Sequence, residues 1–201
     1  MKRLLLILIL TFCFQSLTKA DDIRDFEIEG MSIGDSLLDF YDVDKIKNLE
    51  KINYPNSDKF YGVWINSSSN KYDTYGFTLK KNDNKFKIYQ LKGSIDMNFN
   101  KCMDLKKCLA MKKNISKEFD KIFNNLIIDD STRSHEYDKT GKSKQYQRIY
   151  SFGNGDNRDN HIRIECDTWS KAIKDRDGFT EGLNVVAMTT EILDWIYSDY
   201  K

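Results

Sequence analysis

The chain has 201 residues, with 32 Lys and Arg against 31 Asp and Glu, 13% aromatic residues and one proline. The aromatic content excludes a disordered chain. The balanced charge excludes the basic field of a nucleic-acid binder and the acidic tract of a solvating tail. We therefore expect a globular protein without nucleic acid among its partners.

The first twenty residues predict a secretory signal peptide. Lys2 and Arg3 supply the positive charge, and residues 4–14 form an apolar run shorter than the about 20 residues needed to cross a bilayer. Ala20 is a small residue before cleavage at Asp21. Residues 21–201 are therefore expected to form a single soluble α+β domain without a membrane span, either periplasmic or secreted.

The first half of the mature chain predicts two helices followed by three strands. Ser32 and Asp35 have the spacing of a capping box before apolar residues at helical intervals. A second short helix follows at residues 43–49. Residues 60–65, 75–79 and 86–91 then alternate as strands, with a turn at Asn82-Asp83-Asn84.

The second half repeats this order. An apolar stripe at helical spacing predicts a helix over residues 103–126, and a polar loop is expected at residues 129–143. The remaining elements are strands at 146–152, 161–168 and 183–188 and a helix that begins at Thr189 or Thr190. The expected fold is α+β, with a mostly antiparallel sheet of about six strands covered by the N-terminal helix pair, the long central helix and the C-terminal helix.

Three cysteines remain after the signal peptide, and export favours a disulfide. Within one regular helix, Cys102 and Cys108 would lie about 9 Å apart, which exceeds the reach of a disulfide. Cys166 is expected to face the same core as the helix. We therefore predict a Cys102–Cys166 bond, with Cys108 as a buried free thiol. The alternative is Cys102–Cys108, if the helix begins after Cys102.

Gly34-Asp35-Ser36-Leu37 resembles the signature of the SGNH-type (GDSL) lipases and esterases. That resemblance implies Ser36 as an acyl nucleophile activated by a histidine that stands three residues after an aspartate. Thr132 and Arg158 occupy that position before the only histidines, His135 and His161. We therefore expect no catalytic residue, and Ser36 in the first turns of a helix; an esterase that uses Ser36 remains the alternative.

No cofactor or metal ion is expected. Thr140-Gly141-Lys142-Ser143 matches the end of a P-loop but lacks its upstream glycine, and the two histidines have no ligand partners at metal spacing. Trp64, Trp169 and Trp195 either pack in the core or form a face that binds a sugar or a peptide.

Residues 28–39 (IEGMSIGDSLLD) resemble the mature start of a group of uncharacterised exported proteins of marine bacteria. The similarity extends through residues 139–143 and 166–170 to Asp194-Trp195, and it implies export but no activity. Gly30-Met31-Ser32 is similar, over three residues, to the entry of small outer-membrane lipoprotein and β-lactamase-inhibitor-like modules, which bind other proteins.

Export, balanced charge and the lack of a complete catalytic constellation together predict a non-enzymatic binding module. Its expected partner is another envelope protein or a cell-surface ligand. A structural protein of the cell envelope is a further alternative, besides the esterase.

Overall fold

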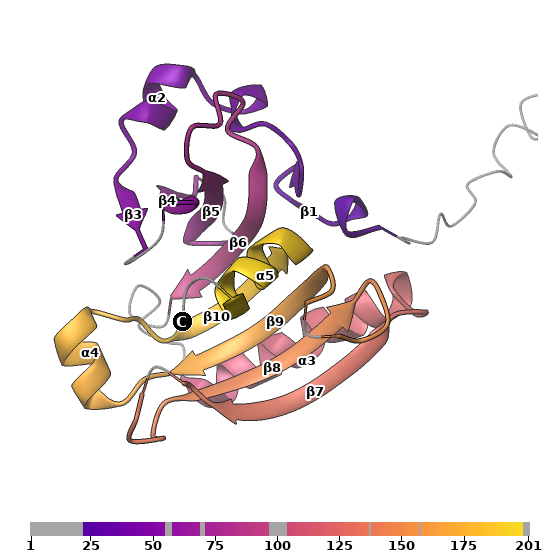
Figure 1. The fold of residues 1–201 in the computed structure, drawn as a ribbon. Helices are drawn as coiled ribbons and strands as arrows, with labels where there is room; N and C mark the ends of the chain where they lie inside the picture. Colours follow the sequence, from indigo (N-terminus) through magenta and orange to yellow (C-terminus); the bar gives the residue numbers. More distant parts are fainter. Residues whose placement is uncertain are drawn as a thin grey trace, which may run out of the picture.

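Eight antiparallel strands form one sheet in the computed structural model, which describes residues 22–54, 58–68, 71–96, 104–136, 138–156 and 158–198 (Figure 1). The strands are β3 (Lys51–Asn53), β4 (Phe60–Asn66), β5 (Thr74–Lys80), β6 (Ile88–Asp96), β7 (Ile127–Ser134), β8 (Lys144–Ser151), β9 (His161–Thr168) and β10 (Gly182–Met188). Their order is β3-β4-β5-β6-β10-β9-β8-β7. Two four-stranded meanders therefore meet where their last strands, β6 and β10, pair in the middle of the sheet.

The first face of the sheet carries the main core. The long helix α3 (Leu105–Ile122), which links the two meanders, packs on β9 and β10 at this face. The N-terminal segment packs on the other half and contains two 3-10 helices (Ile23–Asp25 and Leu37–Asp39), the short strands β1 (Glu27–Ile28) and β2 (Met31–Ser32), and helix α2 (Val43–Lys47). Side chains from both layers share one apolar cluster with the inward residues of the strands.

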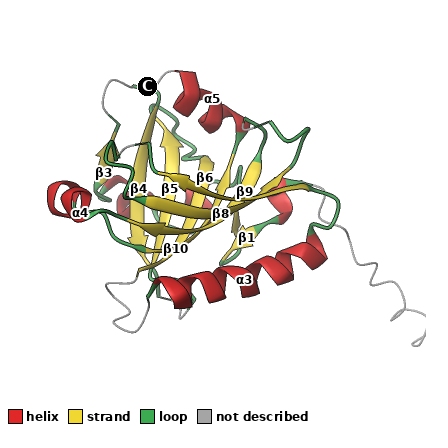
Figure 2. Ribbon diagram, turned by 90° about the horizontal axis from the view of Figure 1, so that it is seen from below, coloured by secondary structure: helices red, strands yellow, loops and turns green. Residues whose placement is uncertain are grey.

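The second face is covered only in part. Helix α5 (Thr190–Ser198) lies on the opposite side of the sheet from α3 (Figure 2). Its Ile192 and Trp195 pack with Phe60, and its Leu193 packs with Val186 and Met188. Helix α4 (Lys171–Asp177) connects β9 to β10 beyond the strand ends. Within the described ranges, no helix combines the length and apolar character that crossing a membrane requires.

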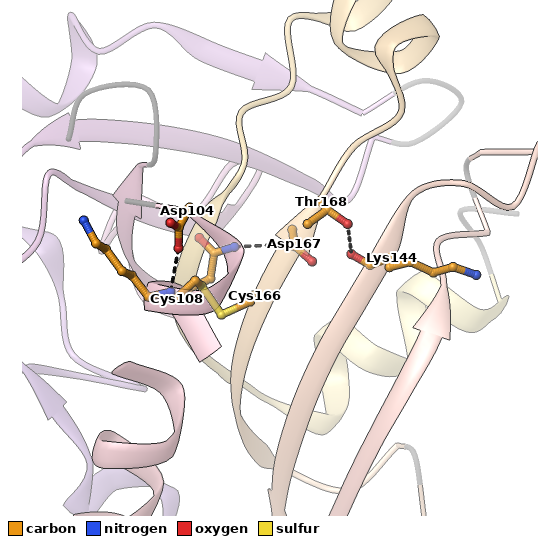
Figure 3. The surroundings of a disulfide bond; sticks show 8 residues. Asp104, Cys108, Lys144, Cys166, Asp167 and Thr168 are labelled. Carbon is orange, nitrogen blue, oxygen red and sulfur yellow. Dashed lines mark hydrogen bonds between the residues drawn. A yellow bond between two sulfur atoms is a disulfide. The ribbon is translucent and has the colours of Figure 1, made fainter. Parts of the chain in front are cut away.

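One disulfide ties α3 to β9, and it corrects the predicted pairing. Cys166 bonds to Cys108, not to Cys102, with a Cα–Cα distance of 6.1 Å (Figure 3). Both cysteines of the bond are fully buried. Helix α3 begins after its N-cap Asp104, so Cys108 lies in the first turns, directly over β9. Cys102 precedes that cap and lies outside the described residues, so the predicted Cys102–Cys166 bond and the free thiol at Cys108 are both wrong.

The first predicted helix does not form at Ser32. Gly34 has φ +95° and donates its N–H to the carbonyl of Ile88, while Ile88 donates back to the carbonyl of Asp35. These bonds to β6 replace helical ones. The capping-box spacing is nevertheless used, because the Asp35 carboxylate accepts the Ser32 N–H at 2.8 Å.

The α+β class and the antiparallel sheet are confirmed, but the predicted count of six strands is wrong. The polar stretch expected as a loop begins with β7, an edge strand whose side chains are exposed along almost its whole length. It pairs with β8 over eight residues, so backbone hydrogen bonds hold it without an apolar face. The structure also contains β3 and helix α4, which the sequence did not predict. The signal peptide lies outside the described residues.

Candidate functional site

A cleft of about 590 Å³, lined by apolar as well as polar groups, opens on the second face of the sheet, beside the part that α5 covers. Strand residues form its floor, and two aromatic groups form its walls. The residues that line it include Trp64, Lys92, Ser94, Asp96, His135, Gln145, Arg163, Glu165, Asp167, Trp169, Phe179, Glu181, Gly182 and Asn184.

The floor is a chain of hydrogen bonds across the central strands. Ser94 of β6 donates to Asn184 Oδ1 of β10 at 2.8 Å, and Asn184 Nδ2 donates to Asp167 Oδ2 of β9 at 2.8 Å. Because side chains alternate along a strand, Asp167 points to this face while its neighbour Cys166 points to α3 (Figure 3). The disulfide therefore anchors, from behind, the strand that carries the cleft's acids.

Asp167 is the most unusual group of the floor. It is only 6% exposed, and its Oδ1 accepts no hydrogen bond. Burial, together with repulsion from Glu165, raises the pKa of Asp167 to about 7, although Lys92, Arg163 and Asn184 favour its charged form. Near neutral pH this carboxyl is therefore partly protonated, and one of its oxygens accepts no hydrogen bond.

Glu165, two residues earlier on β9, has its partners. Arg163 Nε lies 2.5 Å from Glu165 Oε2, and Gln145 Nε2 of β8 donates to the same oxygen at 2.7 Å. Glu165 is 3% exposed, so this pair sits in a weakly screened environment. The two acids of β9 thus differ: one is neutralised by a cation and the other is not.

The first aromatic wall is Trp64 of β4. A Cβ at Gly76, its neighbour on β5, would lie 2.7 Å from the Trp64 ring, so the glycine allows the indole to lie flat across the next strand. Lys92 Nζ lies 5.3 Å from the ring centroid. Trp64 remains 39% exposed, which presents a fixed aromatic surface to the cleft.

The second aromatic wall stands at both ends of α4. Trp169 precedes the helix and Phe179 follows it, with ring centroids 4.7 Å apart. Gly178 ends α4 with φ +68° and turns the chain back toward β10. The indole of Trp169 donates to the carbonyl of Thr180 at 3.0 Å. The ring of His135 is tilted against it, with the two ring centroids 4.2 Å apart.

A second hollow of about 520 Å³ continues from the cleft along the same face. The two hollows share His135, Gln145 and Arg163. The far end of the second hollow is lined by apolar side chains of β7 and α5, among them Ile127 and Ile196. Together the hollows form a groove that is longer than the cleft alone.

The residues singled out from the sequence divide between the groove and other places. Ser36 caps the 3-10 helix Leu37–Asp39; its hydroxyl donates to the carbonyl of Lys85 at 2.5 Å and accepts the N–H of Leu38. Neither histidine donates to Ser36 or accepts from it, and both line the groove on the second face. Trp64 and Trp169 meet at the cleft, whereas Trp195 packs in the core under α5.

The partial P-loop motif belongs to the connection between β7 and β8. The carboxylate of Asp138 accepts hydrogen bonds from Thr140 and Ser143, which lower its pKa. Ser143 in turn accepts the N–H of Ser170 at 3.0 Å. This network holds the loop that carries His135 against the start of α4, so the motif is structural.

Glu165 and Asp167 were not predicted as site residues from the sequence. The available signal was the alternation Ile164-Glu165-Cys166-Asp167 in a strand with one apolar face. Two acids at adjacent outward positions of a core strand indicate a polar surface that the fold then encloses.

The described residues contain no group of three or more His, Cys, Asp and Glu side chains arranged to hold a metal ion. No protein-family model, no curated protein and no solved structure matches this chain. The chemistry of the cleft is therefore the basis for any functional assignment.

Proposed function

We propose that the protein is an exported, non-enzymatic binding module that takes a saccharide of a cell-envelope or cell-surface glycan in the cleft. The supporting observation is the pairing of aromatic walls with a floor of hydrogen-bonding groups. Phe179 and Trp169 present ring faces and edges, while Asn184, Gln145 and Asp167 offer amide and carboxyl groups. A sugar ring has apolar C–H faces and a polar rim of hydroxyls, and it fits such a lining.

The length of the groove supports an oligosaccharide rather than a single sugar. The cleft continues into the second hollow through His135, Gln145 and Arg163, so adjoining sugar units have room on both sides of the shared residues. The buried disulfide is compatible with an oxidising compartment, where envelope glycans are found. The resemblance to exported proteins points the same way.

Calorimetric titration of the mature chain with a panel of oligosaccharides of one to six units tests this function. We expect binding that strengthens with chain length. Phe179→Ala is expected to weaken it about tenfold, because an exposed ring of the wall is lost. Phe40→Ala is the matched control: Phe40 is 39% exposed against 37% for Phe179, and it lies outside the cleft. Absence of binding to every saccharide, or equal loss in both variants, would contradict the proposal.

A further inference from the structure

Strand β7 leaves one side of the sheet open. It is the last strand in the order of the sheet, and among the described strands only β8 pairs with it (Figure 1). This pairing runs over eight residues without a break in register, and the strand contains no proline. The opposite edge strand, β3, has only three residues. A long edge without a bulge or a proline is a template for another strand.

The backbone groups of β7 that face outward follow from its pairing with β8. His135, directly after β7, donates its N–H to the carbonyl of Ser143 at 3.0 Å, in the register that continues the ladder. In an antiparallel ladder, pairs that exchange hydrogen bonds alternate with pairs that point their amides away from each other. The odd-numbered residues of β7 therefore bond to β8. The N–H and C=O groups of the even-numbered residues, from 128 to 134, point to the open side.

Charge selects one antiparallel register for the pairing of β7 with a second copy of itself. Hydrogen bonds between the two open edges need even-numbered positions opposite even-numbered ones. When Ser131 lies opposite Ser131 of the partner subunit, Asp129 lies opposite Arg133 of the partner subunit, and symmetry repeats this contact. Opposite charges directly across an antiparallel pair stabilise it. The two neighbouring registers lose both contacts, and one of them sets Asp130 against Asp130 of the partner subunit, where like charges repel.

The two side chains are available for this contact. Asp129 and Arg133 are 52% and 47% exposed, and both line the groove on the second face of the sheet. Within the strand their charged groups lie 3.4 Å apart, but the arginine has to reach back over four positions, or about 13 Å of strand. Across a strand pair, the Cβ atoms of facing residues are only about 5 Å apart. An arginine of a second copy therefore reaches the Asp129 carboxylate more easily than the arginine of the same strand.

We propose that two copies of this chain associate through β7, in the antiparallel register centred on Ser131, and form one continuous sheet. Ile127 and Ile128, which are 49% and 38% exposed, then lie beside the far end of the facing strand and lose contact with water. The two-fold axis is perpendicular to the sheet, so the second faces of both copies point the same way and their grooves adjoin. One strand from each copy makes a small interface, so the expected dissociation constant is on the order of micromolar.

Sedimentation equilibrium of the mature chain, at about 1 to 500 µM, measures this association. We expect a monomer–dimer equilibrium that weakens as salt is added. Arg133→Asp turns both attractive contacts into repulsive ones and should weaken the dimer about tenfold or more. The double variant Asp129→Arg with Arg133→Asp reverses each pair and should restore the affinity to within about threefold of wild type.

Three results would overturn the proposal. They are a wild-type chain that stays monomeric over this range, a double variant that does not recover, and an Arg133→Asp chain that dimerises as well as wild type. In the last case the charges of β7 act only as a guard of the edge, and they do not select a partner. Circular dichroism of each variant confirms that the fold is kept.

A disulfide across the two-fold axis tests the register separately. In a Cys102→Ala background, Ser131→Cys places two thiols opposite each other with Cβ atoms about 4.5 Å apart, which a disulfide can span. Mild oxidation should therefore give a covalent dimer. Ser134→Cys is the matched control, because in this register its two thiols lie six positions, or about 20 Å, apart. No covalent dimer from Ser131→Cys, or equal amounts from both variants, would contradict the proposed register.

Discussion

The titration of Asp167 makes the stability of the folded chain depend on pH. Its native pKa of about 7 lies above the ordinary value of an aspartate, so the folded chain holds more protons than the unfolded chain between about pH 4 and pH 7. The contribution of Asp167 to stability is therefore complete below about pH 4 and is lost as the pH rises to about 7. A group kept under this cost fits a binding role.

Asp167→Asn should therefore stabilise the empty protein at neutral pH. The amide still accepts from Asn184 but carries no buried charge, so we expect the free energy of unfolding at pH 8 to rise on the order of 2 kcal/mol. Near pH 4, where the carboxyl is already neutral, the two proteins should be nearly equal. Urea denaturation at both pH values measures the difference, and a variant less stable at pH 8 would contradict the account.

His161 has the opposite dependence on pH. Burial, reinforced by Arg163, lowers the pKa of this 4%-exposed side chain to about 3. Between about pH 3 and pH 6.5 the unfolded chain therefore binds the extra proton, and the contribution of His161 is lost as the pH falls through that range.

The variant His161→Gln should remove this loss of stability at acidic pH. Between about pH 4 and pH 6.5, His161 makes the wild-type free energy of unfolding rise with pH and Asp167 makes it fall, so the two effects partly cancel. Each single variant removes one effect and leaves the other visible. We expect the stability of His161→Gln to fall as the pH rises through this interval, and that of Asp167→Asn to rise. Thermal melts at half-unit pH steps give both curves; parallel curves would show that neither group titrates as described.

At the scale of elements, two glycines on neighbouring strands place aromatic rings on opposite faces of the sheet. Gly76 on β5 accommodates Trp64 at the cleft, and Gly93 on β6 accommodates Tyr72 at the core face. A Cβ would meet the ring at 2.7 Å in the first case and at 2.6 Å in the second. Both alanine variants should lose about 1–3 kcal/mol through overpacking.

The binding measurement separates these two variants. Gly76→Ala is expected to displace the Trp64 indole and to weaken saccharide binding, whereas Gly93→Ala is expected to leave the affinity within about twofold because its clash lies on the far face. If Gly93→Ala weakens binding as much as Gly76→Ala does, the effect comes from general destabilisation and Trp64 is not a wall of the site.

The bond between α3 and β9 joins a helix and a strand that are 58 residues apart. In the chain-entropy model a loop of this length is worth about 4 kcal/mol. Cys108→Ala should therefore lower the free energy of unfolding by about 2–5 kcal/mol. Cys102→Ala is the control and should leave both stability and the protection of Cys166 from alkylation unchanged. Reactivity of Cys166 in the Cys102 variant would contradict the pairing.

Elements with an apolar period are the ones that the sequence predicted well. The strand at 161–168 and the long helix have regular apolar spacing, and both occur where expected. β7 was missed because it is held by backbone pairing at the sheet edge and carries no apolar face. The helix expected at Ser32 failed because its residues had local cap chemistry, while Gly34 and Asp35 bond to a strand more than fifty residues away.

The cleft was less predictable than the fold, for a reason of scale. Its floor takes Ser94 and Asp96 from the first meander and Asp167 and Asn184 from the second. No local pattern reports which outward positions of distant strands become neighbours. Of the site residues, the sequence singled out Trp64 and Trp169 because large aromatic residues are candidates for binding surfaces. Glu165 and Asp167 were not singled out, because alternating apolar and polar residues occur in any strand with one exposed face.

The meeting of the two meanders also affects how the chain acquires its structure. Every strand pairing inside a meander is local in sequence. The pairing of β6 with β10 is not, because the partners Ser94 and Asn184 are 90 positions apart. During synthesis the first meander is complete long before its neighbour emerges, so β6 remains an unpaired edge for that interval. Lys92 and Asp96 place charges along this waiting edge, which discourages pairing with a foreign strand. Lys92 and Asp96, which line the cleft of the folded chain, thus also protect this edge against aggregation during synthesis.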